Sequence, residues 1–142
     1  MPRTFVRSGR ACFVHSDRAL APMDVFALLE RVSRARQEVG QPLLFIWSLG
    51  TGVALPSPAV RDALFGALPA LMICAEELFV AVETTEAVRS SFRALLLDPK
   101  GMGHQQRPPR LFRTRDEALA QARRIARDDV LGLERALSGE KP

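Results

Sequence analysis

Two short apolar runs open this chain of 142 residues, and helix-like and strand-like segments then alternate to its C-terminus. The opening runs, Phe5-Val6 and Cys12-Phe13-Val14, flank Ser8-Gly9, which predicts a hairpin of strands over 4–7 and 10–15. Further strands are expected at 43–49, 78–83 and 110–113. Alternation of this kind is typical of an α/β sandwich whose sheet is partly parallel.

The segment after the hairpin has the apolar spacing of an amphipathic helix over 22–38. Pro22 suits the first turn of a helix, and Gly40 followed by Pro42 ends it. The expected buried stripe consists of Val25, Leu28, Leu29, Val32 and Val39. The next strand, 43–49, is apolar without alternation, which predicts a central strand covered on both faces.

Ser57 and Pro58 form a helix-start pattern, with Ser57 as the N-cap and Pro58 as the first helical residue. Pro69 is expected to end or kink this helix. The apolar residues of 70–77 fit either a continued helix or an extended segment.

The C-terminal part predicts two more helices. Thr84 or Thr85 caps one, and Thr114 caps the last, with Glu117 completing a capping box. One apolar stripe runs through the last helix, formed by Leu119, Ala122, Ile125, Ala126, Val130, Leu133 and Leu137. Residues 98–109 read as a loop, and 138–142 as a flexible tail behind a single domain over 1–137.

A hydrophobic content of 47% with 25% charged residues is typical of a soluble globular protein and argues against disorder. The longest apolar stretch, 63–75, is too short to span a bilayer, and the Met-Pro-Arg-Thr start lacks the apolar core of a secretory signal. We therefore expect a cytoplasmic protein. Its two cysteines, Cys12 and Cys74, are expected to be buried free thiols, with a disulfide as the alternative.

The resulting order, β-β-α-β-α-β-α-β-α, resembles the STAS domain of sulphate transporters and anti-sigma factor antagonists, in its small stand-alone bacterial form. The likeness rests on this order, on the strand–loop–Ser–helix run over 43–64, and on the ending over 107–119. It implies a mixed sheet of four or five strands. It also implies a non-enzymatic regulatory module that binds a protein partner, such as a kinase.

In anti-sigma factor antagonists, a Ser at the start of the helix after the central strand is phosphorylated by a partner kinase. The matching residue here is Ser57, although Leu55-Pro56 stand where an Asp usually precedes it. The alternative role of Ser57 is that of a plain helix cap. The partner-binding residues that this likeness implies are Gly50, Gly52, Val53, Ser57 and Arg61, flanked by the helix over 86–97.

No catalytic, metal or cofactor site is predicted. His15, Ser16 and Asp17 are adjacent, and neighbours in a strand point to opposite faces, which is unsuitable for a triad. The spacing of the two histidines and two cysteines does not suit a metal site. Gly50-Thr51-Gly52 lacks the third glycine of a dinucleotide-binding turn.

The net charge of +4 allows an anionic partner, either nucleic acid or a membrane surface, and the candidate anion-binding residues are Arg110, Arg113, Arg123 and Arg127. Arg123 and Arg127 have the i,i+4 spacing of one helix face, where local ion pairs are the alternative. Thin aromatic interleaving makes nucleic acid the less favoured partner. Two further hypotheses are a carrier of a small apolar ligand, and a homodimer through Leu131, Leu133 and Leu137.

Overall fold

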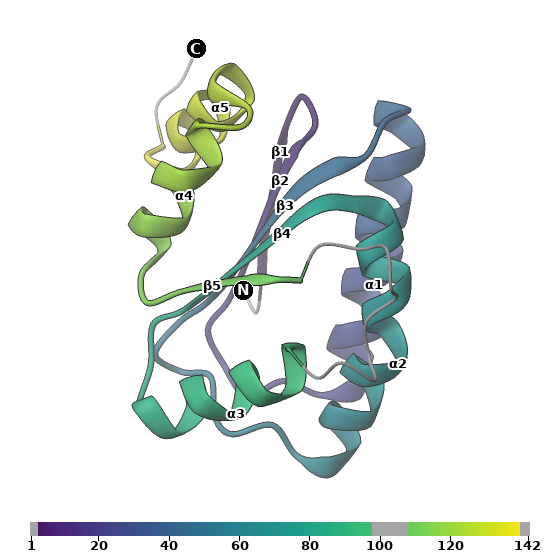
Figure 1. The fold of residues 1–142 in the computed structure, drawn as a ribbon, viewed down its shortest axis with the longest axis vertical. Helices are drawn as coiled ribbons and strands as arrows, with labels where there is room; N and C mark the ends of the chain where they lie inside the picture. Colours follow the sequence, from purple (N-terminus) through teal and green to yellow (C-terminus); the bar gives the residue numbers. More distant parts are fainter. Residues whose placement is uncertain (1–2, 98–107, 140–142) are drawn as a thin grey trace.

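In the computed structural model, which describes residues 3–97 and 108–139, one five-stranded sheet lies between two layers of helices (Figure 1). The strands are β1 (Arg3–Ser8), β2 (Ala11–Ser16), β3 (Leu43–Leu49), β4 (Ala75–Val82) and β5 (Arg110–Phe112). The helices are α1 (Pro22–Val39), α2 (Pro58–Cys74), α3 (Glu86–Leu96), α4 (Arg115–Arg123) and α5 (Arg127–Leu137). The predicted α/β class and mixed sheet are confirmed.

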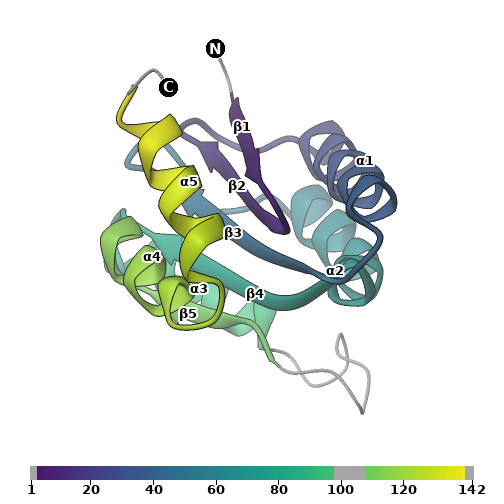
Figure 2. The same ribbon diagram turned by 90° about the horizontal axis from the view of Figure 1, so that it is seen from above.

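The strands lie in the sheet in the order in which they occur in the chain, β1-β2-β3-β4-β5. β1 is antiparallel to β2, and β2, β3, β4 and β5 are parallel to one another. Helices α1, α2 and α3 cover one face, and α4 and α5 cover the other (Figure 2). The carboxyl ends of the four parallel strands therefore meet at one edge, which we call the carboxyl edge.

β3 is the centre of the core, and all seven of its residues are buried. Phe45 and Trp47 face the layer of α1, α2 and α3, whereas Leu44 and Ile46 face α4 and α5. Burial on both faces explains why the strand is apolar without alternation. As predicted, Trp47 belongs to the core, where its indole N–H donates to the Ser16 hydroxyl at 3.3 Å.

Helix α2 does not end at Pro69 but continues to Cys74, and β4 begins at the next residue. Pro69 is exposed, while Leu71 and Met72 beyond it are buried in the core. The burial of these two side chains offsets the hydrogen bond that proline cannot donate. Residues 70–77 are therefore divided between a helix and a strand.

The last predicted helix is two helices, because the chain turns between Arg123 and Arg127. Basic residues at the end of α4 are followed by Asp128 and Asp129 in the first turn of α5. Each group has the charge that the adjacent helix end favours. The turn lets α4 cover β3, β4 and β5 while α5 covers β1 and β2.

The predicted N-caps are confirmed for Ser57 and Thr114, and Thr85 rather than Thr84 caps α3. The Ser57 hydroxyl accepts from the backbone N–H of Val60 at 3.2 Å. Glu117 completes only half of the expected capping box. Its carboxylate accepts from the Thr114 hydroxyl at 3.1 Å, where the full motif would engage the Thr114 backbone N–H.

Both cysteines are free thiols, as predicted. Cys12 is fully buried, and this burial raises the pKa of its thiol to about 11 despite the opposing charge of Arg7. Cys74 is only partly buried, with its sulfur 3.8 Å from the Ser33 hydroxyl oxygen. In the described part of the chain, no helix has the length and apolar character needed to cross a membrane.

Candidate functional site

Ser57 and Arg61 lie at the start of α2, at the carboxyl edge, and both are exposed. Residues 58–61 contain no acidic side chain, so the amino end of this helix lacks a built-in negative partner. The Ser57 oxygen caps the helix, and the residue as a whole is exposed. The position thus fits both predicted roles, a cap and an accessible hydroxyl.

Of the other three predicted partner-binding residues, Gly50 and Val53 are buried, whereas Gly52 is exposed but closely packed. Gly50 and Gly52 pack against Asp17, whose carboxylate accepts from the Gly52 N–H at 2.9 Å. A Cβ atom on Gly52 would lie 2.0 Å from the Asp17 carbonyl oxygen, so only glycine fits there. Val53 is 3% exposed and belongs to the core. These residues shape the loop and leave its exposed side chains to contact a partner.

Four large apolar side chains are exposed on α1, on α2 and on the loop before α2. Met23 is 80% exposed, Phe26 58%, Leu55 59% and Phe65 36%. Helices α1 and α2 follow parallel strands, pack side by side and both begin at the carboxyl edge (Figure 2). We call these four residues the α1–α2 apolar surface. The sequence contained a signal for it, because Met23 and Phe26 lie off the buried stripe of α1.

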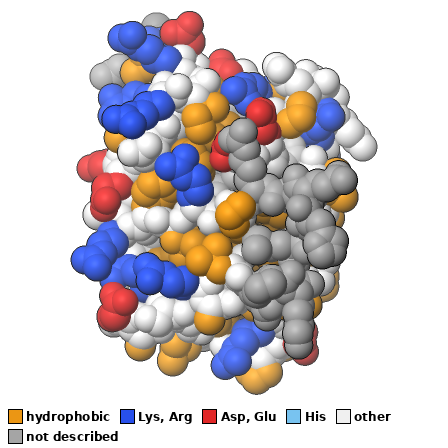
Figure 3. All heavy atoms as spheres, viewed as in Figure 1, with side chains coloured by type: hydrophobic (Ala, Val, Ile, Leu, Met, Phe, Trp, Pro, Cys, Tyr) orange, Lys and Arg blue, Asp and Glu red, His pale blue; other side chains and the backbone are white. Residues whose placement is uncertain are grey.

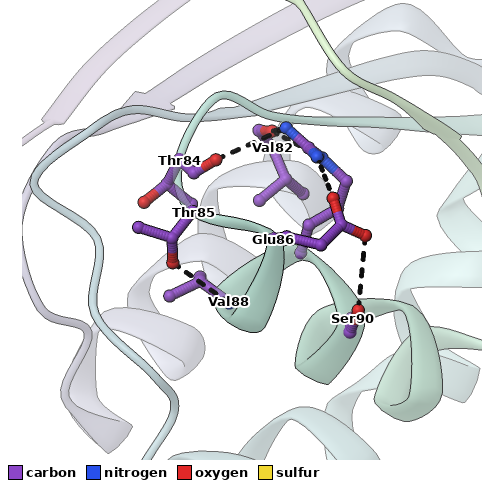
Figure 4. A network of polar contacts seen from close by, with 7 residues as sticks. Val82, Thr84, Thr85, Glu86, Val88 and Ser90 are labelled. Atoms are coloured by element: carbon purple, nitrogen blue, oxygen red, sulfur yellow. Dashed lines mark hydrogen bonds and ion pairs between the residues drawn. The ribbon is translucent and has the colours of Figure 1, made fainter.

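The β4–α3 turn beside this edge is held by Arg89 of α3, whose partners Val82, Thr84 and Glu86 are labelled in Figure 4. Its guanidinium donates to the carbonyl oxygens of Val82 and Thr84, each at 3.4 Å, and pairs with Glu86. Ser90 also donates to Glu86, at 3.5 Å. Only 15% of the Arg89 side chain is exposed, so its charge is committed to the turn.

The predicted anion-binding arginines do not form one patch. Arg110 and Arg113 lie at β5, whereas Arg123 and Arg127 lie at the other end of α4, a helix about 13 Å long. Arg123 and Arg127 are on different helices, so the expected shared face is wrong. Arg110 stacks over the rings of Phe79 and Phe112, with its guanidinium carbon 5.0 and 5.8 Å from their centroids.

Acidic side chains also neutralise part of this charge. Arg123 pairs with Glu134 at 3.3 Å. Figure 3 shows basic side chains distributed along the left of the view, where α4 and α5 lie, with acidic side chains among them. The leucines proposed for a dimer are also largely used inside the protein, since Leu133 is fully buried and Leu137 packs against the same cluster.

A polar group on the α4–α5 side of the carboxyl edge was missed. His15 and Ser48 are register partners on β2 and β3, and the His15 Nδ1 lies 3.0 Å from the Ser48 hydroxyl oxygen. Ser16 points to the opposite face, toward Trp47, as expected for neighbours in a strand. Arg115, at the start of α4, has its guanidinium carbon 5.9 Å from the Phe13 ring centroid.

Pairing between strands brought these residues together, and sequence spacing carries no sign of it. His15 and Ser48 are separated by a whole helix along the chain. Among residues 3–97 and 108–139, no cluster of three His, Cys, Asp or Glu side chains is arranged to hold a metal ion. Of the two histidines considered from the sequence, His104 lies outside the described residues.

In comparisons with known proteins, no protein-family model, curated protein or solved structure matched this chain.

Proposed function

We propose that this chain is a non-enzymatic regulatory module that binds a protein partner through the α1–α2 apolar surface. The observation that supports the proposal is the exposure of Met23, Phe26, Leu55 and Phe65 on two helices that pack together and on the loop before the second. Exposed apolar side chains that form one patch mark interaction sites on soluble proteins, and we propose that these four do so. Methionine and aromatic residues are also enriched in protein interfaces. The likeness to STAS domains points to the same class of function.

Phosphorylation of Ser57 is the proposed switch of this interaction. A phosphate adds about −1.5 to −2 charges. The free N–H groups and the dipole of a helix N-terminus stabilise such a charge. Ser57 is exposed, and it is two residues from Leu55 of the apolar surface. A partner seated on Leu55 would have to remove water from this new charge. Modification therefore weakens binding while leaving α2 folded.

The test is site-specific photo-cross-linking in the host cell. A photoreactive amino acid at Leu55 or Phe26 is expected to capture one defined protein. The same amino acid at Ile73 is the control, because Ile73 is 71% exposed but lies at the far end of α2. Equal capture of the same proteins from all three positions would contradict the proposed surface.

The captured partner is then purified, and its affinity is measured against matched variants by isothermal titration calorimetry. Leu55→Glu is expected to weaken binding at least tenfold, because the apolar contact is replaced by a charge that must be desolvated. Ile73→Glu makes the same chemical change outside the surface and is expected to bind as the wild type does. Identical dissociation constants for Leu55→Glu and the wild type would overturn the proposal.

A further inference from the structure

We propose that His15 and Arg115 form a second site, which binds an oxyanion group of a small molecule, a phosphate or a carboxylate. The site lies at the carboxyl edge on the face of the sheet that α4 and α5 cover. The α1–α2 apolar surface belongs to the opposite face. Carboxyl edges of parallel strands are where α/β proteins commonly bind small ligands.

The two donors are brought together by β2. Phe13 and His15 are two residues apart on this strand, so their side chains share one face. The Arg115 side chain extends from the start of α4 over the Phe13 ring. Arg115 of α4 and His15 of β2 therefore both lie next to Phe13, on the same face of the sheet. Both side chains are half-buried. Neither belongs to the fully buried side-chain atoms that lack a hydrogen-bond partner in the described part of the chain.

Ser48 sets the direction of the histidine hydrogen bond. It is fully buried, and His15 Nδ1 is the partner of its hydroxyl within the described residues. A buried hydroxyl proton needs an acceptor, so the Ser48 hydroxyl donates to Nδ1. The ring proton of neutral His15 is then on Nε2. In this form Nε2 offers its N–H to an anion.

The guanidinium of Arg115 is available for a ligand. Across residues 3–97 and 108–139, none of the ion pairs involves it. Two carboxylates, those of Glu83 and Asp17, also lie at this edge, and each accepts a hydrogen bond from a backbone amide. Glu83 accepts from the Arg115 backbone N–H at 3.1 Å, and Asp17 accepts from the Gly52 N–H at 2.9 Å. Arginine presents two parallel N–H groups, which suits phosphate and carboxylate oxygens.

Smaller residues follow a row of large ones beside these donors. Phe13, Ile46 and Phe79 are register partners that fill one row of this face. Two residues further along, the corresponding row is His15, Ser48 and Ala81. Beyond it, Gly50 lies against both the Asp17 carboxylate and the imidazole, because a Cβ there would be 2.5 Å from Asp17 Oδ1 and 2.9 Å from His15 Cε1. The large apolar row thus gives way to a row that contains two polar side chains and one alanine at the carboxyl edge.

The experiment is a titration of the intact protein with inorganic phosphate, and in parallel with acetate, at constant ionic strength. The imidazole NMR signals are followed, and they are simple because the chain has only two histidines, His15 and His104. His104→Gln assigns the two sets of signals. A saturable shift confined to His15 is expected, and the probe that binds more tightly identifies the preferred oxyanion.

Arg115→Gln keeps the length of the side chain and removes its charge. It is expected to weaken phosphate binding at least about tenfold, as the loss of a charged hydrogen-bond partner does. Arg113→Gln is the control, since Arg113 is exposed and lies just before α4. No saturable shift of His15 with either probe, or equal weakening by both variants, would overturn the site.

His15→Gln is the second variant and covers the case in which Arg115→Gln does not fold. It retains a group that can bond Ser48, and its affinity for phosphate is measured by calorimetry. At least a fivefold loss of affinity is expected, and an unchanged affinity would contradict the role of His15. Partner binding through Leu55 is expected to be unaffected by this substitution. The oxyanion site and the α1–α2 apolar surface are therefore tested independently of each other.

Discussion

Asp129 in the first turn of α5 accepts a hydrogen bond from the backbone N–H of Arg10, at 3.2 Å, although 119 residues separate them. The contact fastens the β1–β2 hairpin to the last helix. Gly9, in the hairpin turn, has a φ of +56°, and a Cβ there would lie 2.1 Å from the Asp129 carboxylate. The turn therefore needs glycine for its backbone and for its space.

Gly9→Ala is expected to lower the free energy of unfolding by roughly 1–3 kcal/mol, the cost of strain at a left-handed position with a blocked Cβ. Gly66→Ala is the matched control in the interior of α2, where a new Cβ meets nothing within 4 Å. It is expected to stabilise the protein by roughly 0.5–1 kcal/mol. Urea denaturation measures both, and similar values for the two variants would contradict the account of the turn.

Two substitutions of Ser57 distinguish its role as a helix cap from its proposed role as a switch. Ser57→Ala removes the oxygen that accepts from Val60 and is expected to cost about 1 kcal/mol, with partner affinity unchanged. Ser57→Asp keeps a capping oxygen and adds charge, so it is expected to retain stability but weaken partner binding. Isothermal titration calorimetry with the partner that cross-linking identifies measures the affinity of Ser57→Asp. An unchanged affinity of Ser57→Asp would count against the switch.

Arg89 is expected to matter far more than the residue it pairs with. Arg89→Ala leaves the carbonyl groups of Val82 and Thr84 without their donor, and a loss of roughly 1–3 kcal/mol is expected. Glu86→Ala removes an exposed partner and is expected to cost less than about 1 kcal/mol. Thermal and urea unfolding measure both values. Equal losses would show that the ion pair, rather than the carbonyl contacts, holds the turn.

Cys12 makes stability depend on alkaline pH. Burial raises the pKa of its thiol from 9.0 to about 11, so the folded state resists the loss of the proton more than the unfolded state does. Its contribution is complete below pH 9 and is lost as pH rises through 11. Relative to Cys12→Ala, the wild type is expected to lose roughly 2 kcal/mol by pH 11. A pH-independent difference in urea denaturation would contradict this.

Local patterns predicted the elements well, because their causes are local. Ser57 before Pro58 fixed the start of α2, and the uninterrupted apolar run of β3 indicated burial on both faces. The prediction that α2 ends or kinks at Pro69 was wrong about the end, since the decisive factor is the burial of Leu71 and Met72. The division between α4 and α5 had a local sign, in the basic and then acidic residues after Ala122.

The candidate sites were less predictable, because they depend on contacts between distant segments. The exposure of Leu55 depends on where the loop before α2 lies against the rest of the protein. The partnership of His15 with Ser48 exists only once β2 and β3 pair in one register. The likeness to STAS domains pointed to the start of α2, and it did not extend to the group of His15 and Arg115.

The order of the strands has a consequence for synthesis on the ribosome. Each parallel strand joins the edge formed just before it, so the sheet can grow as the chain emerges. Its second face remains bare until the residues of α4 and α5 have left the exit tunnel, since these helices supply its cover. Phe13, Ile46 and Phe79 are exposed to water during that interval. A chain truncated before Arg115 would keep this apolar face permanently open, and aggregation is its expected fate.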